Sequence, residues 1–242
     1  MEFARLLAAR GYAVALSARR ADRLESLAAE LEREYRVRTF VFASDLAEPG
    51  AALRLCQAIA AEGIEIDVLV NNAGFGLLGN FVETPWERER AMIDLNVRAL
   101  VELTKRFLPG MVERGRGRVL NVASTAAFQP GPLMAVYFAT KAFVLSFSEA
   151  VNEELRGTGV NVTTLCPGPT QSEFFEKAEA RDRQLGKGKL PTARQVASFG
   201  ISALFQGKRT VVYGFANRIL ALLGRIAPRD TVIRGTRKVL ER

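Results

Sequence analysis

Residues 118–141 read RVLNVASTAAFQPGPLMAVYFATK. The Val- and Leu-rich run at residues 118–122 predicts a strand, and the apolar sequence that begins at Tyr137 predicts a long helix. Ser124 follows the strand, while Tyr137 and Lys141 are four residues apart and therefore share one face of the helix. The stretch predicts a strand–helix unit that carries a hydroxyl, a phenol and an amine.

These three groups suit acid–base chemistry at an oxygen atom. An ammonium ion beside the phenol of Tyr137 favours the phenolate and lowers a pKa that starts near ~10. The hydroxyl of Ser124 can hold a substrate oxygen while the phenol gives or takes a proton. The alternative is a buried tyrosine and a lysine whose charged end reaches solvent on an ordinary helix, and a short motif alone does not decide between the two.

Strands and helices alternate along the chain. Strands are predicted at residues 12–17, 37–43, 64–70, 118–122, 160–165 and 209–213. Helices are predicted at residues 2–10 and 22–35, from 45, from 84 toward 107, at 137–155 and from 192. Capping boxes are predicted at Asp22 with Glu25, Thr84 with Glu87, and Thr192 with Gln195. The alternation predicts an α/β fold, a Rossmann-type doubly wound parallel sheet between two helix layers, with ligands beyond the carboxyl ends of the strands.

Composition limits the class of protein. Of 242 residues, 48% are hydrophobic, which suits one large α/β domain over residues 1–214 followed by a basic helical tail at 215–242. The chain has no histidine, which excludes Ser-His-Asp and Cys-His catalysis and any His-ligated metal site, so we expect no metal. The tail holds seven Lys/Arg and two acids, so it supplies most of the +8 net charge, and the balanced body does not indicate nucleic-acid binding.

Two cysteines, Cys56 and Cys166, do not make a disulfide framework, and the first residues predict an amphipathic helix rather than a signal peptide. No apolar run reaches the ~18 residues of a membrane span. We therefore expect a cytoplasmic protein.

Five motifs occur in the order and rough spacing of the short-chain dehydrogenase/reductase family, namely residues 71–74 (NNAG), Asn96, Ser124, Tyr137 with Lys141, and residues 167–170 (PGPT). On these motifs the chain resembles that family from residue 1 to about 213. The resemblance implies a Rossmann-type fold and hydride transfer between NAD(P) and a carbonyl/alcohol pair of a small molecule. It also implies a homo-oligomer.

The resemblance implies roles for single residues. Tyr137 resembles the general acid/base, and Lys141 resembles the residue that lowers the Tyr137 pKa and holds the nicotinamide ribose. Ser124 would orient the carbonyl, and Asn96 would hold the water of a proton relay. The cofactor would be lined by Asn72, Ala73 and Gly74, by Asp45 and Leu46 at the adenine, and by Pro167, Gly168 and Thr170 near the nicotinamide.

Arg19 and Arg20 follow the strand at residues 12–17. An acid at this place would bind the ribose 2′-hydroxyl of NAD, whereas a guanidinium suits a 2′-phosphate. We therefore expect NADP in preference to NAD. The alternative is that the two arginines form a solvated turn before the helix.

The resemblance departs at the N-terminus, where the family has a strand and a Thr-Gly-x-x-x-Gly-x-Gly loop before the helix that residues 1–10 match. That strand would lie at the sheet centre, between the strands at residues 12–17 and 66–70, and without it ladder hydrogen bonds are lost. We expect that the gene starts upstream of Met1. The alternative is that the chain is truly this short and binds the cofactor weakly. In that case it would be a non-catalytic binding or scaffold protein if cofactor binding is lost.

Two further segments have more than one interpretation. Residues 171–191 are polar and predict a mobile substrate lid, with a surface loop as the alternative. The tail from Phe215 places apolar residues at helical spacing among arginines. This pattern has four alternative interpretations. They are core packing with a solvated basic face, an interfacial helix on an anionic membrane, a dimer contact, and a cap over the substrate pocket. An apolar substrate is indicated by Phe75, Leu77, Leu78, Phe128, Leu133 and Met134.

Overall fold

The computed structural model describes residues 1–174, 178 and 190–241. Its strands are β1 (Val14–Ala18), β2 (Thr39–Ala43), β3 (Val68–Asn71), β4 (Gly117–Val122), β5 (Val160–Cys166) and β6 (Thr210–Val212). Its α-helices are α1 (Glu2–Ala8), α2 (Ala21–Tyr35), α3 (Ala51–Ala61), α4 (Trp86–Ile93), α5 (Leu100–Glu113), α6 (Ala135–Glu154), α8 (Ala193–Phe205), α9 (Phe215–Ile226) and α10 (Arg229–Glu241). Two shorter turns are the π-helical η1 (Asp94–Ala99) and the 3₁₀ η2 (Thr125–Phe128).

The paired strands are all parallel, as the alternation predicts. They form a two-stranded sheet of β1 and β2 and a four-stranded sheet in the order β3-β4-β5-β6. In the described part of the chain, β1 pairs with β2 alone and β3 with β4 alone, so the sheet is interrupted between β1 and β3. The interruption lies where the resemblance places a further strand, and the predicted α/β class is confirmed.

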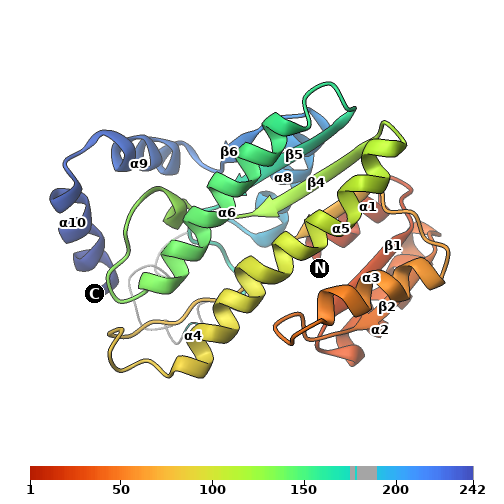
Figure 1. The fold of residues 1–242 in the computed structure, drawn as a ribbon, viewed down its shortest axis with the longest axis horizontal. Coiled ribbons are helices and arrows are strands. Elements are labelled where there is room, and N and C mark those ends of the chain that lie inside the picture. The colour runs from red at the N-terminus through yellow and green to blue at the C-terminus, as the bar shows by residue number, and fades with distance from the viewer. Residues whose placement is uncertain (175–177, 179–189, 242) are drawn as a thin grey trace.

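Helices cover both faces of the four-stranded sheet (Figure 1). In β4, Val119 packs with Met111 of α5 on one side, whereas Leu120 packs with Ile201 of α8 on the other. Val119, Leu120 and Met111 are fully buried. Since a strand covered on two faces buries successive side chains, β4 needs an apolar run rather than an alternating one.

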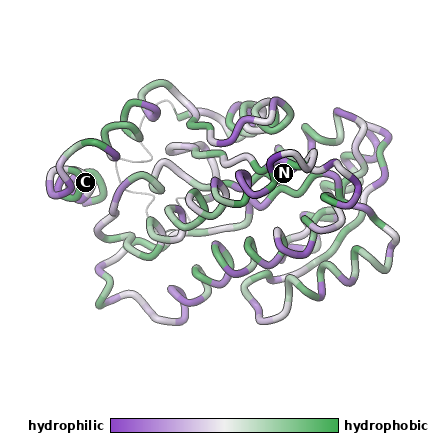
Figure 2. Tube along the Cα trace, turned by 45° about the horizontal axis from the view of Figure 1, so that its top comes forward, coloured by the Kyte–Doolittle hydropathy of each residue, from purple (hydrophilic) through white to green (hydrophobic). Residues whose placement is uncertain are grey.

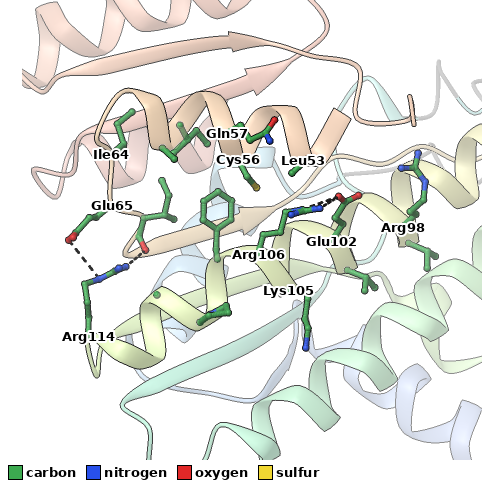
Figure 3. Close-up of a pocket in the computed structure, with 18 of the residues that line it drawn as sticks. Leu53, Cys56, Gln57, Ile64, Glu65, Arg98, Glu102, Lys105, Arg106 and Arg114 are labelled. Atoms are coloured by element: carbon green, nitrogen blue, oxygen red, sulfur yellow. Dashed lines mark hydrogen bonds and ion pairs between the residues drawn. The ribbon is translucent and has the colours of Figure 1, made fainter. Parts of the chain in front are cut away.

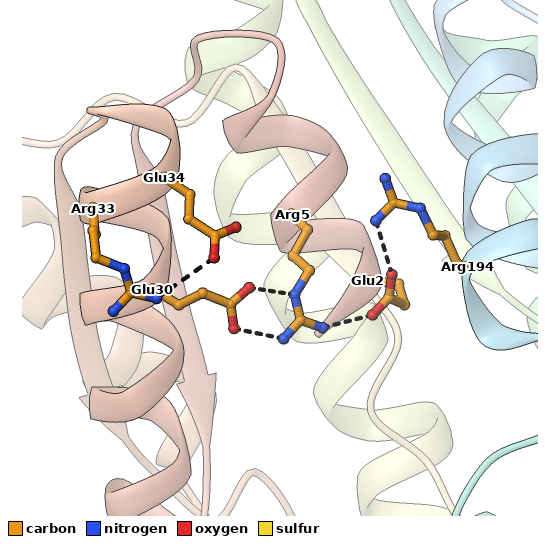
Figure 4. Close-up of polar contacts among 6 residues, drawn as sticks. All are labelled: Glu2, Arg5, Glu30, Arg33, Glu34 and Arg194. Atoms are coloured by element: carbon orange, nitrogen blue, oxygen red, sulfur yellow. Dashed lines mark hydrogen bonds and ion pairs between the residues drawn. The ribbon is translucent and has the colours of Figure 1, made fainter.

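Helix α1 bridges the two sheets. Leu7 belongs to the core cluster of β3, β4, β5 and α8, while Ala8 belongs to the cluster of β1 and α2. Ion pairs strengthen the bridge, as Figure 4 shows. The Arg5 guanidinium donates to both carboxylate oxygens of Glu30 on α2, at 2.6 and 2.7 Å, and to Glu2 at 2.6 Å. Glu2 also lies 3.6 Å from Arg194 at the start of α8, so α1 ties elements of both sheets together.

Three local predictions are wrong. The predicted capping boxes at Asp22 and at Thr84 do not form, and the helix predicted from residue 45 begins later. Helix α2 starts after Arg20 and α4 after Pro85, and neither has a side-chain cap. Thr84 instead hydrogen bonds to the Phe81 carbonyl and to Glu89. The helix predicted from residue 45 begins at Ala51, because residues 45–50 turn and end at Gly50 with a φ of +71°.

The third predicted capping box is confirmed. The Thr192 side chain accepts from the Gln195 N–H at 3.2 Å, and the Gln195 side chain accepts from the Thr192 N–H at 2.9 Å. This reciprocal pair opens α8.

The predicted tail forms α9 and α10, which lie at one end of the molecule, while β1, β2 and α3 lie at the other (Figure 1).

Candidate active site

The four predicted catalytic residues come together beyond the ends of β3 and β4. Tyr137 and Lys141 lie on α6 and are almost fully buried, and the Lys141 amine lies 5.9 Å from the centre of the Tyr137 ring. The Ser124 side chain interacts with the Tyr137 phenol, and its hydroxyl donates to the Pro167 carbonyl at 3.5 Å. The Ser124 hydroxyl oxygen also accepts from the Ala126 N–H at 3.1 Å, which fixes the serine at the start of η2.

Asn96 lies inside the π-helical turn η1 and is buried. Its amide nitrogen donates to the Phe75 carbonyl at 3.0 Å and to the Thr140 hydroxyl at 3.1 Å, while its amide oxygen accepts from the Phe75 N–H at 3.1 Å. Asn96 thus joins the loop after β3 to α6, one residue from Lys141. Periodicity predicts one continuous helix here, and the π turn is a local departure of the kind found at functional sites.

Gly74 lies against this cluster. A Cβ atom added to Gly74 would lie 2.9 Å from the amide oxygen of Asn96 and 3.5 Å from the amine of Lys141. The neighbouring Asn72 and Ala73 are exposed. The backbone of residues 72–74 is therefore accessible to a ligand beside Lys141, as expected of a loop that lines a cofactor.

Burial dominates the protonation of the two central groups. Burial raises the pKa of Tyr137 to about 12, and the hydrogen bond with Ser124 opposes this shift. Burial lowers the pKa of Lys141 to about 8. The causes of the Tyr137 shift do not include Lys141, whose amine lies 5.9 Å from the ring centre, so the expected lowering of the Tyr137 pKa by Lys141 stays a prediction.

The loop at residues 167–170 lies beside Ser124. The Thr125 N–H donates to the Pro167 carbonyl at 2.8 Å, and the Thr170 hydroxyl donates to the Gly168 carbonyl at 2.9 Å. A Cβ atom on Gly168 would lie 2.4 Å from the side-chain nitrogen of Asn217, which is on α9. The predicted nicotinamide loop is thus in contact with the tail.

The predicted adenine end lies where β1 and β2 end. Arg19 and Arg20 are exposed, and Arg19 lies 3.6 Å from the Asp45 carboxylate. Arg20 pairs with Glu173 at 2.9 Å. The side chain of Leu46 is buried in the core beneath α3, so this residue offers only its backbone to a ligand.

An apolar wall surrounds Tyr137. Of the six residues that indicate an apolar substrate, five belong to or pack against the cluster that contains Tyr137, namely Phe75, Leu77, Leu78, Leu133 and Met134. Phe128 packs instead with Leu100 and Val144. Leu240 of α10 and Phe174 also belong to this wall, and the Phe174 ring centre lies 5.2 Å from that of Tyr137.

The predicted lid is described only in part, at residues 171–174, 178 and 190–191. Gly186 and Gly188 lie outside the described residues.

Sequence reasoning missed a buried polar network behind the site. The Asn71 side chain donates to the Thr104 hydroxyl at 3.1 Å and to the Asn121 amide oxygen at 2.9 Å. Asn121 in turn donates to Ser148 at 2.8 Å. The signal was an asparagine inside the otherwise apolar β4 run, since a buried amide needs partners.

A groove of about 1000 Å³ lies between α3 and α5 (Figure 3). Leu53 and Cys56 line it from α3, and Arg106 and Phe107 line it from α5. None of the predicted catalytic residues lines this groove, so the acid–base chemistry does not belong to it.

A nicotinamide dinucleotide fits the residues present. The exposed backbone at Gly74 next to Lys141 suits a ribose, and the exposed guanidinium groups of Arg19 and Arg20 suit a phosphate. The two regions follow parallel strands at the edge where such sheets bind ligands.

Residues 1–183 match the model of the short chain dehydrogenase family. The chain is 38% identical over 166 residues to a very-long-chain 3-oxoacyl-CoA reductase of Laccaria bicolor, which covers 68% of this chain and 49% of that protein. It is 39% identical over 168 residues to an uncharacterized oxidoreductase of Myxococcus xanthus, which covers 69% of this chain and 66% of that protein. The chain spans about half the length of the reductases it matches.

Solved structures share the fold. A short-chain dehydrogenase from Sphingobium yanoikuyae in complex with NADPH has a TM-score of 0.82 and 30% identity, over 92% of this chain and 87% of that chain. A structure of a 7beta-hydroxysteroid dehydrogenase has a TM-score of 0.84 and 28% identity, over 97% of this chain and 90% of that chain. The predicted family and Rossmann-type fold are confirmed, and the chain belongs to the short chain dehydrogenase family of oxidoreductases.

Proposed function

We propose that this chain is an NADP(H)-dependent oxidoreductase that reduces the carbonyl of an apolar substrate, with Tyr137 as the proton donor. One observation carries the proposal, namely the cluster of Ser124, Tyr137 and Lys141 beside the open backbone at Gly74. The names of its relatives suggest the substrate class, a 3-oxoacyl thioester with a long acyl chain.

The proposed cofactor site uses residues that the sequence predicts. Lys141 and the backbone of residues 72–74 would hold the nicotinamide ribose, and Pro167, Gly168 and Thr170 would lie near the ring. Arg19 and Arg20 would bind the 2′-phosphate, which is the basis for preferring NADP. The Sphingobium relative is described in complex with NADPH, which supports this choice. When bound, the cofactor supplies the hydride that reaches the carbonyl carbon.

The proton comes from this chain. As negative charge develops on the substrate oxygen, the Ser124 hydroxyl donates a hydrogen bond to it and the Tyr137 phenol transfers its proton to it, which gives the alcohol. The Tyr137 phenol is protonated at neutral pH, as a proton donor must be. The Lys141 ammonium would stabilise the phenolate that this step leaves on Tyr137, and Asn96 would hold the water of the relay that returns a proton to it.

The apolar wall around Tyr137 accommodates the acyl chain. Leu77, Met134 and Leu240 are buried within it, and the tilted ring of Phe174 lies 5.2 Å from the centre of the Tyr137 ring. A polar substrate would leave its hydrogen-bonding groups unpaired against this wall.

A second copy of the chain would pack on α5 and α6, in line with the predicted homo-oligomer. Phe143 is exposed on α6, and its ring stacks on that of Phe147 with centres 5.9 Å apart. The groove of Figure 3 adjoins Phe143 and continues the apolar surface onto α5. Sedimentation of the chain and of Phe143→Ser tests this assembly, and an unchanged mass for the variant would refute it.

Tyr137→Phe tests the proposed function. The chain is assayed by loss of NADPH absorbance with 3-oxoacyl thioesters of increasing length, alone and with a Gly-rich strand and loop joined ahead of Met1. Tyr137→Phe should lower turnover at least about 10³-fold and leave NADPH binding intact. Tyr35→Phe removes a hydroxyl elsewhere and should change nothing.

Two results would contradict the proposal. Equal turnover by the parent and Tyr137→Phe would remove Tyr137 from the reaction. NADPH binding without reduction of any carbonyl would favour the alternative, a binding or scaffold protein with this fold.

A further inference from the structure

Helix α9 presents its apolar side chains to solvent. Phe215, Leu222 and Ile226 are 77%, 59% and 69% exposed, and Ile219 and Leu223 are also exposed. These residues recur at helical spacing, so they form one stripe along the helix. If α9 packed as an ordinary core helix, these apolar side chains would be buried. The interpretation of the tail as core packing is therefore wrong for α9.

The inward face of α9 is made of small and polar residues. Ala221 is buried. Asn217 lies against Gly168, and a Cβ atom on Gly224 would lie 2.9 Å from the Phe128 carbonyl oxygen. The Asn217 side chain also donates to the Tyr213 carbonyl at 2.8 Å. These close contacts fix the rotation of α9, so the outward apolar stripe is built into the fold.

The charge around the stripe is positive. Residues 215–229 contain three arginines and no acid, and Arg234 and Lys238 are exposed on α10. Figure 2 shows α9 and α10 at the edge of the molecule, with apolar and polar residues alternating along them. Like charges on the tails of two copies would repel, whereas an anionic surface would attract them. The charge thus favours an anionic lipid surface over a second copy.

We propose that the apolar stripe of α9 docks in the headgroup region of an anionic membrane. A helix with an apolar stripe and basic neighbours lies in the plane of such an interface. Among the described helices, none is both long enough and apolar enough to cross a bilayer.

The docking face adjoins the candidate active site. Through Asn217 and Gly224, α9 rests on the loops that carry Gly168 and Phe128, and Leu240 of α10 belongs to the cluster that contains Tyr137. Docking would place the apolar wall of the site next to the membrane. An apolar substrate could then reach it without crossing water.

Flotation with vesicles tests the proposal. The full chain should float with phosphatidylcholine vesicles that contain phosphatidylglycerol and not with phosphatidylcholine alone, and added salt should weaken binding. Leu222→Ser with Ile226→Ser should lower the partition coefficient at least about tenfold. Arg229→Gln with Arg234→Gln should also weaken binding. Both pairs are exposed, so the fold is retained, which circular dichroism and the melting temperature check.

Phe81→Ser with Val82→Ser is the matched control, since both residues are exposed and apolar and lie outside the tail. This pair should float like the parent. Equal loss by the control and the α9 pair would overturn the assignment to α9. If the α9 pair instead converts a dimer to a monomer and does not change flotation, the face binds a second copy and the membrane proposal fails.

These outcomes are independent of the reductase proposal, because flotation needs neither cofactor nor turnover.

Discussion

The amine of Lys141 donates a hydrogen bond to the carbonyl of Val122 at 2.8 Å, so the last residue of β4 holds the cation beneath the Tyr137 ring. The amine is buried, and its pKa falls to about 8. Buried groups with shifted pKa values are typical of functional sites, so this position supports Lys141 as a candidate site residue.

Stability should therefore rise with pH between about 8 and 10. In this window the folded chain has released the Lys141 proton, whereas the unfolded chain still holds it, and an unfolded state that binds more protons makes stability increase with pH. The full effect is about 3 kcal/mol. Lys141→Met should remove the rise, which urea unfolding at several pH values measures. A parallel rise in the variant would show that another group causes it. The raised Tyr137 pKa acts only above pH 10, where it lowers stability.

Ser124→Ala should affect rate and pH profile together. The variant loses the hydrogen bond to the developing oxyanion, which should lower kcat/KM about 10²-fold. It also loses the hydrogen bond that lowers the Tyr137 pKa, so the alkaline limb of the rate profile should move to higher pH. Ser124→Thr keeps a hydroxyl and should restore most of the rate, and the exposed Ser198→Ala should have no effect. A lowered rate with an unmoved limb would mean that Ser124 does not act on Tyr137.

The sequence could predict the fold because largely apolar strand segments alternate with helical segments along the chain. Two-sided burial of β4 requires such a segment, and the carboxyl-end rule then places Ser124 near residues 72–74. It could also predict that Tyr137 and Lys141 lie together, because their spacing on α6 fixes them on one face, whereas the roles expected of Ser124 and Asn96 came from the family resemblance.

The rest depends on contacts that spacing does not encode. The Tyr137 pKa depends on burial in a cluster whose members are distant in sequence, such as Phe174, which follows Tyr137 by 37 positions. The π turn at Asn96 depends on partners at Phe75 and Thr140. The apolar stripe of α9 faces outward because of the contacts of Asn217 and Gly224. Periodicity alone predicts an apolar face on a helix, and it does not predict whether that face points to the core or to solvent.

Arg20→Ala should change the affinity for NADPH and not the affinity for NADH. If Arg20 binds the 2′-phosphate, the variant should raise the Kd for NADPH at least about tenfold and leave the Kd for NADH unchanged. Glu173 lies 2.9 Å from Arg20 and would compete with the phosphate, so Glu173→Gln should tighten NADPH binding. Fluorescence titration of the parent and both variants with NADPH and NADH measures the six dissociation constants. Unchanged Kd values for both NADH and NADPH would leave the two arginines as a solvated turn, and an equal loss for both would place Arg20 on a part of the cofactor other than the 2′-phosphate.

Gly74→Ala should damage both stability and activity, although its φ lies outside the left-handed region. The added Cβ would lie 2.9 Å from the Asn96 amide oxygen, and Asn96 cannot yield without breaking its bonds to Phe75 and Thr140. We expect a loss of about 2 kcal/mol in the free energy of unfolding and loss of NADPH binding. Thermal unfolding and fluorescence titration measure the two effects.

Gly110→Ala is the control for this crowding argument, since Gly110 lies inside α5 and its added Cβ would meet only the flexible end of Arg114, at 3.1 Å. Alanine is the better helix former, so this variant should be as stable as the parent or gain up to about 1 kcal/mol. NADPH binding should not change, because Gly110 is on the groove of Figure 3 and not at the candidate active site. If Gly74→Ala proved as stable and as active as Gly110→Ala, the contact between Gly74 and Asn96 would not position the site, and Lys141 would hold its place through Val122 alone.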